Sequence, residues 1–450
     1  MKNTILLISC IILSSCCYSV KIFKQPDMSK QEYIRDEFGR ICIYHGVNIS
    51  NFTKNSGKPS GYYNRGVADT CWQQPEDFCS LSTWGFNLTR LLWHWEAIEP
   101  QKNIFNKEYI HKQIERIKWA ANYDIQVVVD IHQDLYTQKF CGNGFPEWTV
   151  LNNSILFNGC TDPWNLAYLD KAVLTAYHNF WNNKELQDKY VDMVDSVFKW
   201  VDTIPNVLGV DIMNEPFPDM SGKFERKKLT NLYNRIHNMV KEKEYKKLIF
   251  FEPWMGTSTG IPTCLKIKGG PGTVYYPHYY DAFIDEKREY KEENKILLKK
   301  AIPIKVQESQ KFKSPLLYGE FGATPKDLNY LNDLINEFDF YNIGWTYYAH
   351  DLPQYSSFTF IDENKNPNAI FSVLHRVYPM KIAGDAPVYY LKDKAFYLSY
   401  NKSKASNSTI IYIPPNLNIS VETSGEYNII GNYLYYTNTN EIPQSIKIIY

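Results

Sequence analysis

Short runs of β-branched and aromatic residues alternate with amphipathic stretches along most of the chain. Some runs are apolar at consecutive positions, as at Val127, Val128 and Val129, which is typical of parallel strands covered on both faces. Strands that alternate with helices indicate βα units around a parallel sheet. We count eight strand-like runs, at residues 41–47, 87–93, 125–131, 207–213, 247–252, 273–278, 315–319 and 341–347.

The stretches between these runs repeat apolar residues every three or four positions, as helices that bury one face do. The spacing is clear at Ile110, Ile114, Ile117 and Ala121, at Tyr190, Val194, Val197 and Val201, at Leu229, Leu232, Ile236 and Val240, and at Leu328, Leu331 and Ile335. Eight strands with such helices predict an α/β fold of the TIM (β/α)8 barrel type, here over residues 20–384. The long third connection, residues 134–205, is expected to carry an active-site loop with Gly142, Gly144 and Pro146.

The pattern changes near Ala386, where helical periodicity stops and Tyr, Ile, Asn and Thr recur in short alternating runs. Runs at residues 408–414, 418–422, 427–437 and 445–450 are typical of antiparallel strands. We therefore predict a small C-terminal antiparallel β-sandwich domain at residues 385–450.

The first nineteen residues have the layout of a signal peptide. Lys2 precedes an apolar run at residues 5–13 and small residues before Ser19, so residues 1–19 are expected to be cleaved near Ser19 and the protein secreted. No later run is long enough to cross a bilayer. The alternative is a bacterial lipobox with lipid on Cys16.

Removing the leader leaves an even number of cysteines, which suits an oxidising compartment. They are Cys42, Cys71, Cys79, Cys141, Cys160 and Cys264. Cys71 with Cys79 and Cys141 with Cys160 would close short loops and are the favoured pairs, whereas Cys42 and Cys264 are either bridged or buried thiols. Sequons, among them Asn87 inside a predicted strand, identify a glycoprotein only where they are exposed.

Composition narrows the function classes. The 49 basic and 49 acidic residues balance, so no net field attracts nucleic acid. The histidines are scattered without ligand spacing, so no metal is expected. No phosphate-binding glycine loop or Cys-x-x-Cys pair occurs, and we expect no cofactor.

Candidate chemistry gathers where the predicted strands end, the side of a TIM barrel that carries active sites. The residues at these ends are Asn48, Arg90 with His94, His132 with Asp134, Asn214 with Glu215, Glu252, His278 with Tyr280, Glu320, and Trp345. Glu215 ends the fourth run and Glu320 the seventh. Two carboxyl groups about 5 to 5.5 Å apart are what a retaining glycosidase requires, so Glu320 is predicted as nucleophile and Glu215 as acid/base.

The neighbours fit these roles. Arg90, His278 and Tyr280 are available to keep Glu320 ionised, and the charge of Glu320 would favour a proton on Glu215. Asn214 can hold the sugar 2-hydroxyl. Glu252, in a Glu-Pro-Trp string, can equally anchor a loop, and we leave it out of the predicted site.

The strings Asn214-Glu215-Pro216 and Gly319-Glu320-Phe321-Gly322, together with Arg90, His132 and the His278-Tyr279-Tyr280 element, resemble glycoside hydrolase family 5. Residues 130–134 (Asp-Ile-His-Gln-Asp), Phe180-Trp181, residues 213–217 and an early Lys54 resemble more closely the endoglycoceramidases of that family, which cut an intact oligosaccharide from ceramide. The resemblance runs from about Ile41 to Tyr378 and agrees with an appended β-domain.

The resemblance implies Glu215 and Glu320 as catalytic residues. It implies Asn214, Arg90, His132, His278, Tyr280 and Trp345 as their supports, with Trp345 as a sugar platform. Lys54, Asp134 and Trp181 would contact the sugars nearest the ceramide, although such a Lys is often solvated and such a Trp often packed in a core. Either Tyr279 or Tyr280 could face Glu320.

The predicted function is hydrolysis of the bond between a glycan and ceramide with retention of configuration. The alternatives are an endo-β-glucanase, a glucosylceramide-cleaving enzyme, or an inactive barrel that only binds glycolipid. A glycosphingolipid is therefore the expected partner. Transient contact with a membrane or micelle and an activator protein that presents the lipid are compatible with this function.

Overall fold

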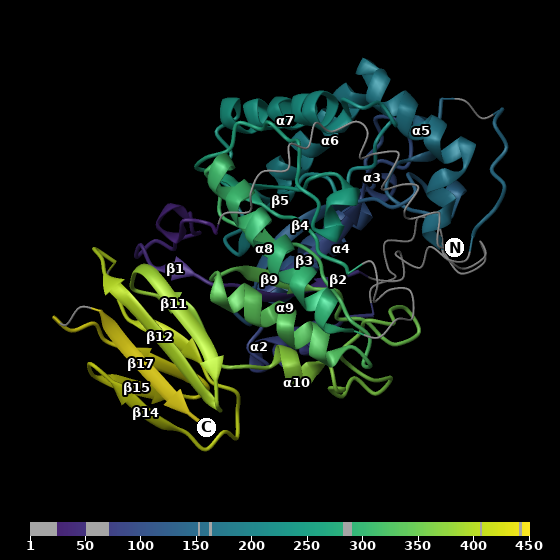
Figure 1. Cartoon of the computed structure of the whole chain (residues 1–450). Helices are drawn as coiled ribbons and strands as arrows, with labels where there is room; N and C mark the ends of the chain where they lie inside the picture. Colours follow the sequence, from purple (N-terminus) through teal and green to yellow (C-terminus); the bar gives the residue numbers. More distant parts are fainter. Residues whose placement is uncertain are drawn as a thin grey trace.

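The structure is a computed structural model that describes residues 25–50, 72–151, 154–161, 164–281, 290–405, 407–440 and 443–450. The predicted signal peptide, Lys54 and Cys71 lie outside the described residues. Figure 1 shows a barrel surrounded by helices, with a smaller group of strands at one end that contains the C-terminus.

Eight parallel strands form the barrel, in the order β7-β6-β5-β4-β3-β2-β9-β8. A parallel bridge between Tyr275 and Leu316 joins the two outer strands and closes it. The predicted TIM barrel is thus confirmed. The strands are β2 (His45–Ile49), β3 (Leu88–His94), β4 (Gln126–His132), β5 (Val207–Asp211), β6 (Leu248–Phe251), β7 (Thr273–Tyr275), β8 (Leu317–Tyr318) and β9 (Gly344–Tyr347).

The alternation of side chains along the strands separates two cores. Val127, Val129 and Ile131 of β4 face outward into the large core under the helices. Val128 faces inward, where it packs in a smaller core with residues such as Leu88 and Phe250. Arg90 lies two positions after Leu88 on β3, and Asp130 lies two positions after Val128 on β4, so both side chains also face inward. The interior of the barrel is thus apolar in its middle and polar toward the carboxyl ends of the strands.

Helices cover the outside of the barrel (Figure 1). Several begin at capping residues: the Asn106 side chain accepts a hydrogen bond from the backbone N–H of Tyr109, and Asn183 accepts one from that of Leu186. All four predicted helices are present. The helices are α2 (Pro75–Thr83), α3 (Trp95–Ile98), α4 (Lys107–Ala121), α5 (Lys171–Asn182), α6 (Lys184–Val201), α7 (Thr230–Glu242), α8 (Glu292–Phe312), α9 (Leu328–Phe340) and α10 (Phe371–Leu374).

The C-terminal part is a two-sheet sandwich, with strand orders β1-β10-β13-β16-β15 and β11-β12-β17-β14. Its core joins both sheets, as Ile411 and Leu434 pack with Phe396 and Ile448. The strands are β1 (Ile41–Cys42), β10 (Tyr378–Ile382), β11 (Gly384–Lys392), β12 (Ala395–Lys402), β13 (Thr409–Tyr412), β14 (Ser420–Thr423), β15 (Tyr427–Ile430), β16 (Tyr433–Tyr436) and β17 (Gln444–Ile449).

Three predicted boundaries differ from this arrangement. The run at residues 41–47 is divided, because Ile41 pairs with Ile382 in the sandwich while the first barrel strand begins at His45. The sandwich also takes in β10, which the prediction assigned to the barrel. The run at residues 427–437 is a hairpin that turns at Gly431, where φ is +57°.

Polar contacts attach the sandwich to the barrel. The Tyr378 hydroxyl donates to the carbonyl of Gly85 at 2.6 Å, and the Tyr412 hydroxyl donates to that of Thr83 at 2.8 Å. These contacts lie at the amino ends of the barrel strands, away from the carboxyl ends that carry the candidate chemistry. Among the described residues, no helix is both long and apolar enough to cross a membrane.

Candidate active site

Glu320 follows β8 and is held by two donors. Nη1 of Arg90 lies 2.7 Å from its Oε1, and the Tyr280 hydroxyl donates to its Oε2 at 2.9 Å. Only 1% of the side chain is exposed. Both donors favour the ionised carboxylate, which is the form a nucleophile needs. Of the two candidate tyrosines, Tyr280 is therefore the one that faces Glu320.

Glu215 follows β5 in a backbone conformation that non-glycine residues rarely adopt, with φ at +36°. Its Oε1 lies 2.9 Å from Nδ1 of His278 and accepts a hydrogen bond from the Ser258 hydroxyl at 3.3 Å. The side chain is 13% exposed. Glu215 is thus the more accessible of the two carboxylates.

One imidazole nitrogen links the two carboxylates. Nδ1 of His278 lies 2.9 Å from Oε1 of Glu215 and 3.8 Å from Oε2 of Glu320. The sum of these two distances, 6.7 Å, is the upper limit for the separation of the two oxygens. This limit admits the spacing of about 5 to 5.5 Å found in retaining glycosidases and excludes most of the inverting range of about 6.5 to 9.5 Å.

Arg90 connects the floor of the site. Its Nη2 contacts carboxylate oxygens of Asp130, Asp211 and Glu252 at 3.0, 2.8 and 3.0 Å, in addition to the Nη1 contact with Glu320. Burial and the neighbouring Glu252 raise the pKa of Asp211 well above its usual range, although the Arg90 charge opposes this shift.

His278 is charged in this setting. Burial alone would lower its pKa, but the charges of Glu252 and Glu320 and the contacts with Glu215 and Glu252 raise it to about 10. Its Nε2 lies 3.1 Å from Oε1 of Glu252. Glu252, which follows β6, is therefore a site residue that the sequence analysis omitted.

His132, Asp134 and Asn214 extend the site toward β4. His132 lies between two acids, with Nδ1 2.7 Å from Asp130 and Nε2 3.3 Å from Asp134. The Asn214 amide donates to the carbonyl of Gln133 at 3.0 Å, and its oxygen accepts from Arg90 at 2.8 Å. These contacts orient Asn214 beside Glu215.

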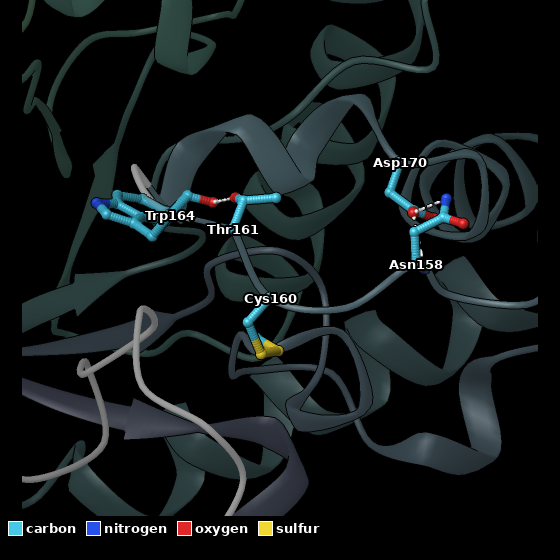
Figure 2. Close-up of a disulfide and its surroundings, with 6 residues drawn as sticks. Asn158, Cys160, Thr161, Trp164 and Asp170 are labelled. Carbon is cyan, nitrogen blue, oxygen red and sulfur yellow. Dashed lines mark hydrogen bonds between the residues drawn. A yellow bond between two sulfur atoms is a disulfide. The ribbon is translucent and has the colours of Figure 1, made fainter.

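The long connection after β4 is closed by the predicted disulfide between Cys141 and Cys160, whose Cα atoms are 5.7 Å apart. Figure 2 shows this bond and, beside it, Asn158, which donates to Asp170 at the start of α5. On the other side of the loop, Asn143 pairs with Asp134 through their backbones. The disulfide thus supports the segment that carries Asp134. No disulfide joins Cys42 to Cys264, and the proposed pairing of Cys79 involves Cys71, outside the described residues.

A sequence model of the cellulase family, glycosyl hydrolase family 5, matches residues 54–351, which is more than half of the chain. The chain belongs to glycosyl hydrolase family 5. It is therefore a glycoside hydrolase, as the carboxylate pair predicts.

Relatives within the family extend over most of the chain. An endoglycoceramidase of Cyanea nozakii is 25% identical over 437 residues, covering 86% of this chain and 83% of that protein. One of Hydra vulgaris is 23% identical, covering 91% and 86%. The solved structure of endo-glycoceramidase II from a Rhodococcus species in complex with ganglioside GM3 has a TM-score of 0.82 at 20% identity, covering 93% of this chain and 99% of that one.

One family 5 prediction is wrong. Trp345 is completely buried, and its ring stacks on His45 at 4.3 Å in the core between barrel and helices. Its neighbour Thr346 faces inward instead, where its hydroxyl donates to the carbonyl of Gly319. Trp345 consequently has no surface for a sugar. Tyr348, just beyond β9, lies on the inward-facing parity at the barrel mouth and is 8% exposed.

Trp181 and Lys54 remain predictions. The Trp181 indole donates to the carbonyl of Phe217 at 2.8 Å, and the residue is 4% exposed. It thereby anchors the segment after Glu215. Lys54 falls in a stretch whose two ends, Ser50 and Trp72, both donate to the Asp351 carboxylate, at 2.5 and 2.8 Å.

Proposed function

We propose that this family 5 member is an endoglycoceramidase, which hydrolyses the β-glycosidic bond between the oligosaccharide and the ceramide of glycosphingolipids with retention of configuration. The observation that carries the proposal is the pair Glu215 and Glu320, whose oxygens lie within 6.7 Å of each other around His278. The endoglycoceramidases of Cyanea nozakii and Hydra vulgaris, similar over most of their lengths, support the lipid-linked substrate.

In the first step, a carboxylate oxygen of Glu320 attacks the anomeric carbon while Glu215 gives its proton to the glycosidic oxygen. The carbon–oxygen bond to ceramide breaks, ceramide leaves as the alcohol, and an ester joins the glycan to Glu320. Arg90 and Tyr280 hold the nucleophile in place through its two oxygens, so little reorganisation is needed as its charge is consumed.

In the second step, a water molecule takes the place of the ceramide oxygen. Glu215, now ionised, removes one proton from the water as its oxygen bonds to the anomeric carbon. The ester bond breaks, Glu320 regains its charge, and the glycan leaves with its original anomeric configuration. Two inversions at one carbon produce net retention.

The other predicted site residues have supporting roles in this proposal. Asn214 and His132 would bind the sugar at the cleavage point, and Lys54, Asp134 and Trp181 the sugars nearest the ceramide. The burial of His132 and Asp134, which are both about 1% exposed, suits groups whose bonds to a substrate form in a water-excluded pocket.

Secretion after removal of residues 1–19 is part of the same proposal, because these residues have the layout of a signal peptide. Transient contact with a membrane or micelle is supported by exposed leucines in the connection after β4, where Leu151 is 52% and Leu156 84% exposed. Exposed leucines on a loop can enter a lipid surface. An activator protein that presents the lipid is compatible with this arrangement.

The test is digestion of ganglioside, glucosylceramide and soluble β-glucan with the whole protein. The proposal expects intact oligosaccharide and ceramide from ganglioside. Release of glucose from glucosylceramide alone, or cleavage of the glucan alone, would assign the alternative family 5 activities. Binding of ganglioside without hydrolysis would indicate a catalytically silent barrel. Glu320→Gln, which keeps the side-chain volume, serves as the inactive control.

A further inference from the structure

Glu252 contacts three residues of the proposed active site: Glu215, His278 and Arg90. Its Oε2 accepts a hydrogen bond from the backbone N–H of Glu215 at 2.8 Å. Its Oε1 lies 3.1 Å from Nε2 of His278 and 3.0 Å from Nη2 of Arg90. The side chain is 1% exposed. It therefore acts on the reaction only through its neighbours.

The contact with Glu215 restrains a strained backbone. A non-glycine residue at a φ of +36° is disfavoured and persists only where its surroundings hold it. The Glu252 carboxylate accepts a hydrogen bond from the N–H of Glu215, and the Gln133 amide donates one to the carbonyl of Glu215 at 3.0 Å. The direction of the Glu215 side chain depends on this pair of contacts.

The contact with His278 determines its protonation. A neutral imidazole has a single N–H, yet both nitrogens of His278 face carboxylate oxygens: Nε2 faces Glu252, while Nδ1 faces Glu215 and, at 3.8 Å, Glu320. The cation Arg90 contacts Oε1 of Glu252, the same oxygen that faces Nε2 of His278, and Oε1 of Glu320. Nδ1 makes a hydrogen-bonded contact with Glu215, whereas Nε2 makes an ion-pair contact with Glu252 that is not aligned as a hydrogen bond. Only the doubly protonated ring presents a proton to the carboxylates on both sides.

Glu252 itself is ionised. Burial would raise its pKa, but His278 and Arg90 lower it below the usual value. The pKa of the neighbouring Asp211 is raised by burial and by the charge of Glu252. Glu252 thus places a negative charge 3.1 Å from Nε2 of His278.

We propose that Glu252 is a positioning residue that keeps His278 as an imidazolium, so that its Nδ1–H donates to Oε1 of Glu215 and the proton for the leaving group is carried on Oε2. The part of this inference that concerns proton donation rests on the proposed function, because that function makes Glu215 the acid. The protonation of His278 does not depend on that role.

The direct test is nuclear magnetic resonance of the whole protein with ¹⁵N-labelled histidine, with His278→Asn used to assign the His278 signals among the nine histidines. We expect both ring nitrogens of His278 to stay protonated up to at least pH 9 in the wild type. In Glu252→Gln the pKa of His278 should fall by about 1 to 3 units, the usual effect of removing an adjacent opposite charge. Glu252→Asp, which restores the charge, should recover most of the shift.

Glu225→Gln is the matched control. Glu225 is also buried and accepts hydrogen bonds from the backbone of the segment after β6, including the N–H of Trp254 at 3.4 Å, but it does not contact His278. The Glu225→Gln substitution should therefore leave the pKa of His278 unchanged. A wild-type His278 that is neutral at pH 7, or a pKa that does not move in Glu252→Gln, would overturn the proposal even if that variant were inactive.

A kinetic test addresses proton donation. A misdirected acid harms poor leaving groups most, so Glu252→Gln should lower kcat for lactosylceramide at least about tenfold more than for dinitrophenyl β-lactoside, whose leaving group needs no proton. Equal losses of kcat on both substrates would show that Glu252 only maintains the structure of the site, and would refute its effect on proton donation by Glu215. If the wild type cleaves no lactosylceramide while His278 titrates as expected, the proposed function fails and the assignment of the His278 charge stands.

Discussion

Arg90 on β3 and Glu320 after β8 meet at 2.7 Å inside the barrel, although β2 and β9 lie between their strands. The guanidinium is completely buried and also contacts Asp130, Asp211 and Glu252. A single cation therefore fixes Glu320, the proposed nucleophile, relative to acids on three other strands.

Replacing Arg90 with Lys should lower kcat by about 10² to 10³, the usual loss when one preorganised donor to a reacting group is removed. Lys keeps the charge but cannot reproduce the planar fork that reaches Glu320 and Asp211 together. Steady-state kinetics on an aryl β-lactoside measure the effect. Arg116→Lys, at a buried arginine on α4 outside the site, is the control, and a loss of similar size there would refute the specific role of Arg90.

The two glutamates should be distinguishable by azide rescue. In Glu215→Ala, azide should enter in place of the water and yield the β-glycosyl azide, because Glu320 still forms the ester. In Glu320→Ala, azide should replace the nucleophile itself and yield the α-azide. The anomer is read from proton coupling constants on an activated aryl glycoside. Exchange of the two products between the variants would reverse the assigned roles.

Tyr348 and Trp345 should respond in opposite ways. Trp345→Phe removes part of a ring packed on His45 and Phe86 and should lower the free energy of unfolding by about 1 to 3 kcal/mol with KM unchanged. Tyr348→Ala at the mouth should raise KM about 3- to 10-fold, the worth of one aromatic stacking contact. Urea unfolding and kinetics on both variants separate the effects, and a raised KM only in Trp345→Phe would contradict this placement.

Removal of the disulfide by Cys141→Ser with Cys160→Ser should destabilise the protein by about 3 kcal/mol, the scale expected for a loop of this length. Because Asn143 inside the loop pairs with Asp134, KM should rise more than kcat falls. Calorimetry and kinetics provide the measurements. Reductant should reproduce the loss in the wild type and add nothing to the double variant; an effect of reductant on that variant would point to another bond.

The local pattern of the chain was sufficient for most of the fold. Apolar runs, helical periodicity and capping residues such as Asn106 and Asn183 act over a few positions, and eight repeats of strand and helix have one common solution. That solution places Glu215 and Glu320 at one mouth, so the pair could be predicted without coordinates. The β11–β12 hairpin was not predicted from the sequence. Its turn residues, Asp393 and Lys394, adopt positive φ angles without the glycine that usually identifies such a turn.

The sequence by itself determined the barrel and its two catalytic candidates, because strand order and strand ends follow from local periodicity. Only the tertiary structure decided which neighbours serve them. Whether Trp345 faces the sugar or the helices depends on which alternate residues of β9 (Gly344–Tyr347) point into the barrel. Thr346 points inward, so Trp345 points toward the helices. Whether Glu252 anchors a loop or holds His278 depends on how β6 lies against β5 and β7, and such contacts between distant segments leave no local signature.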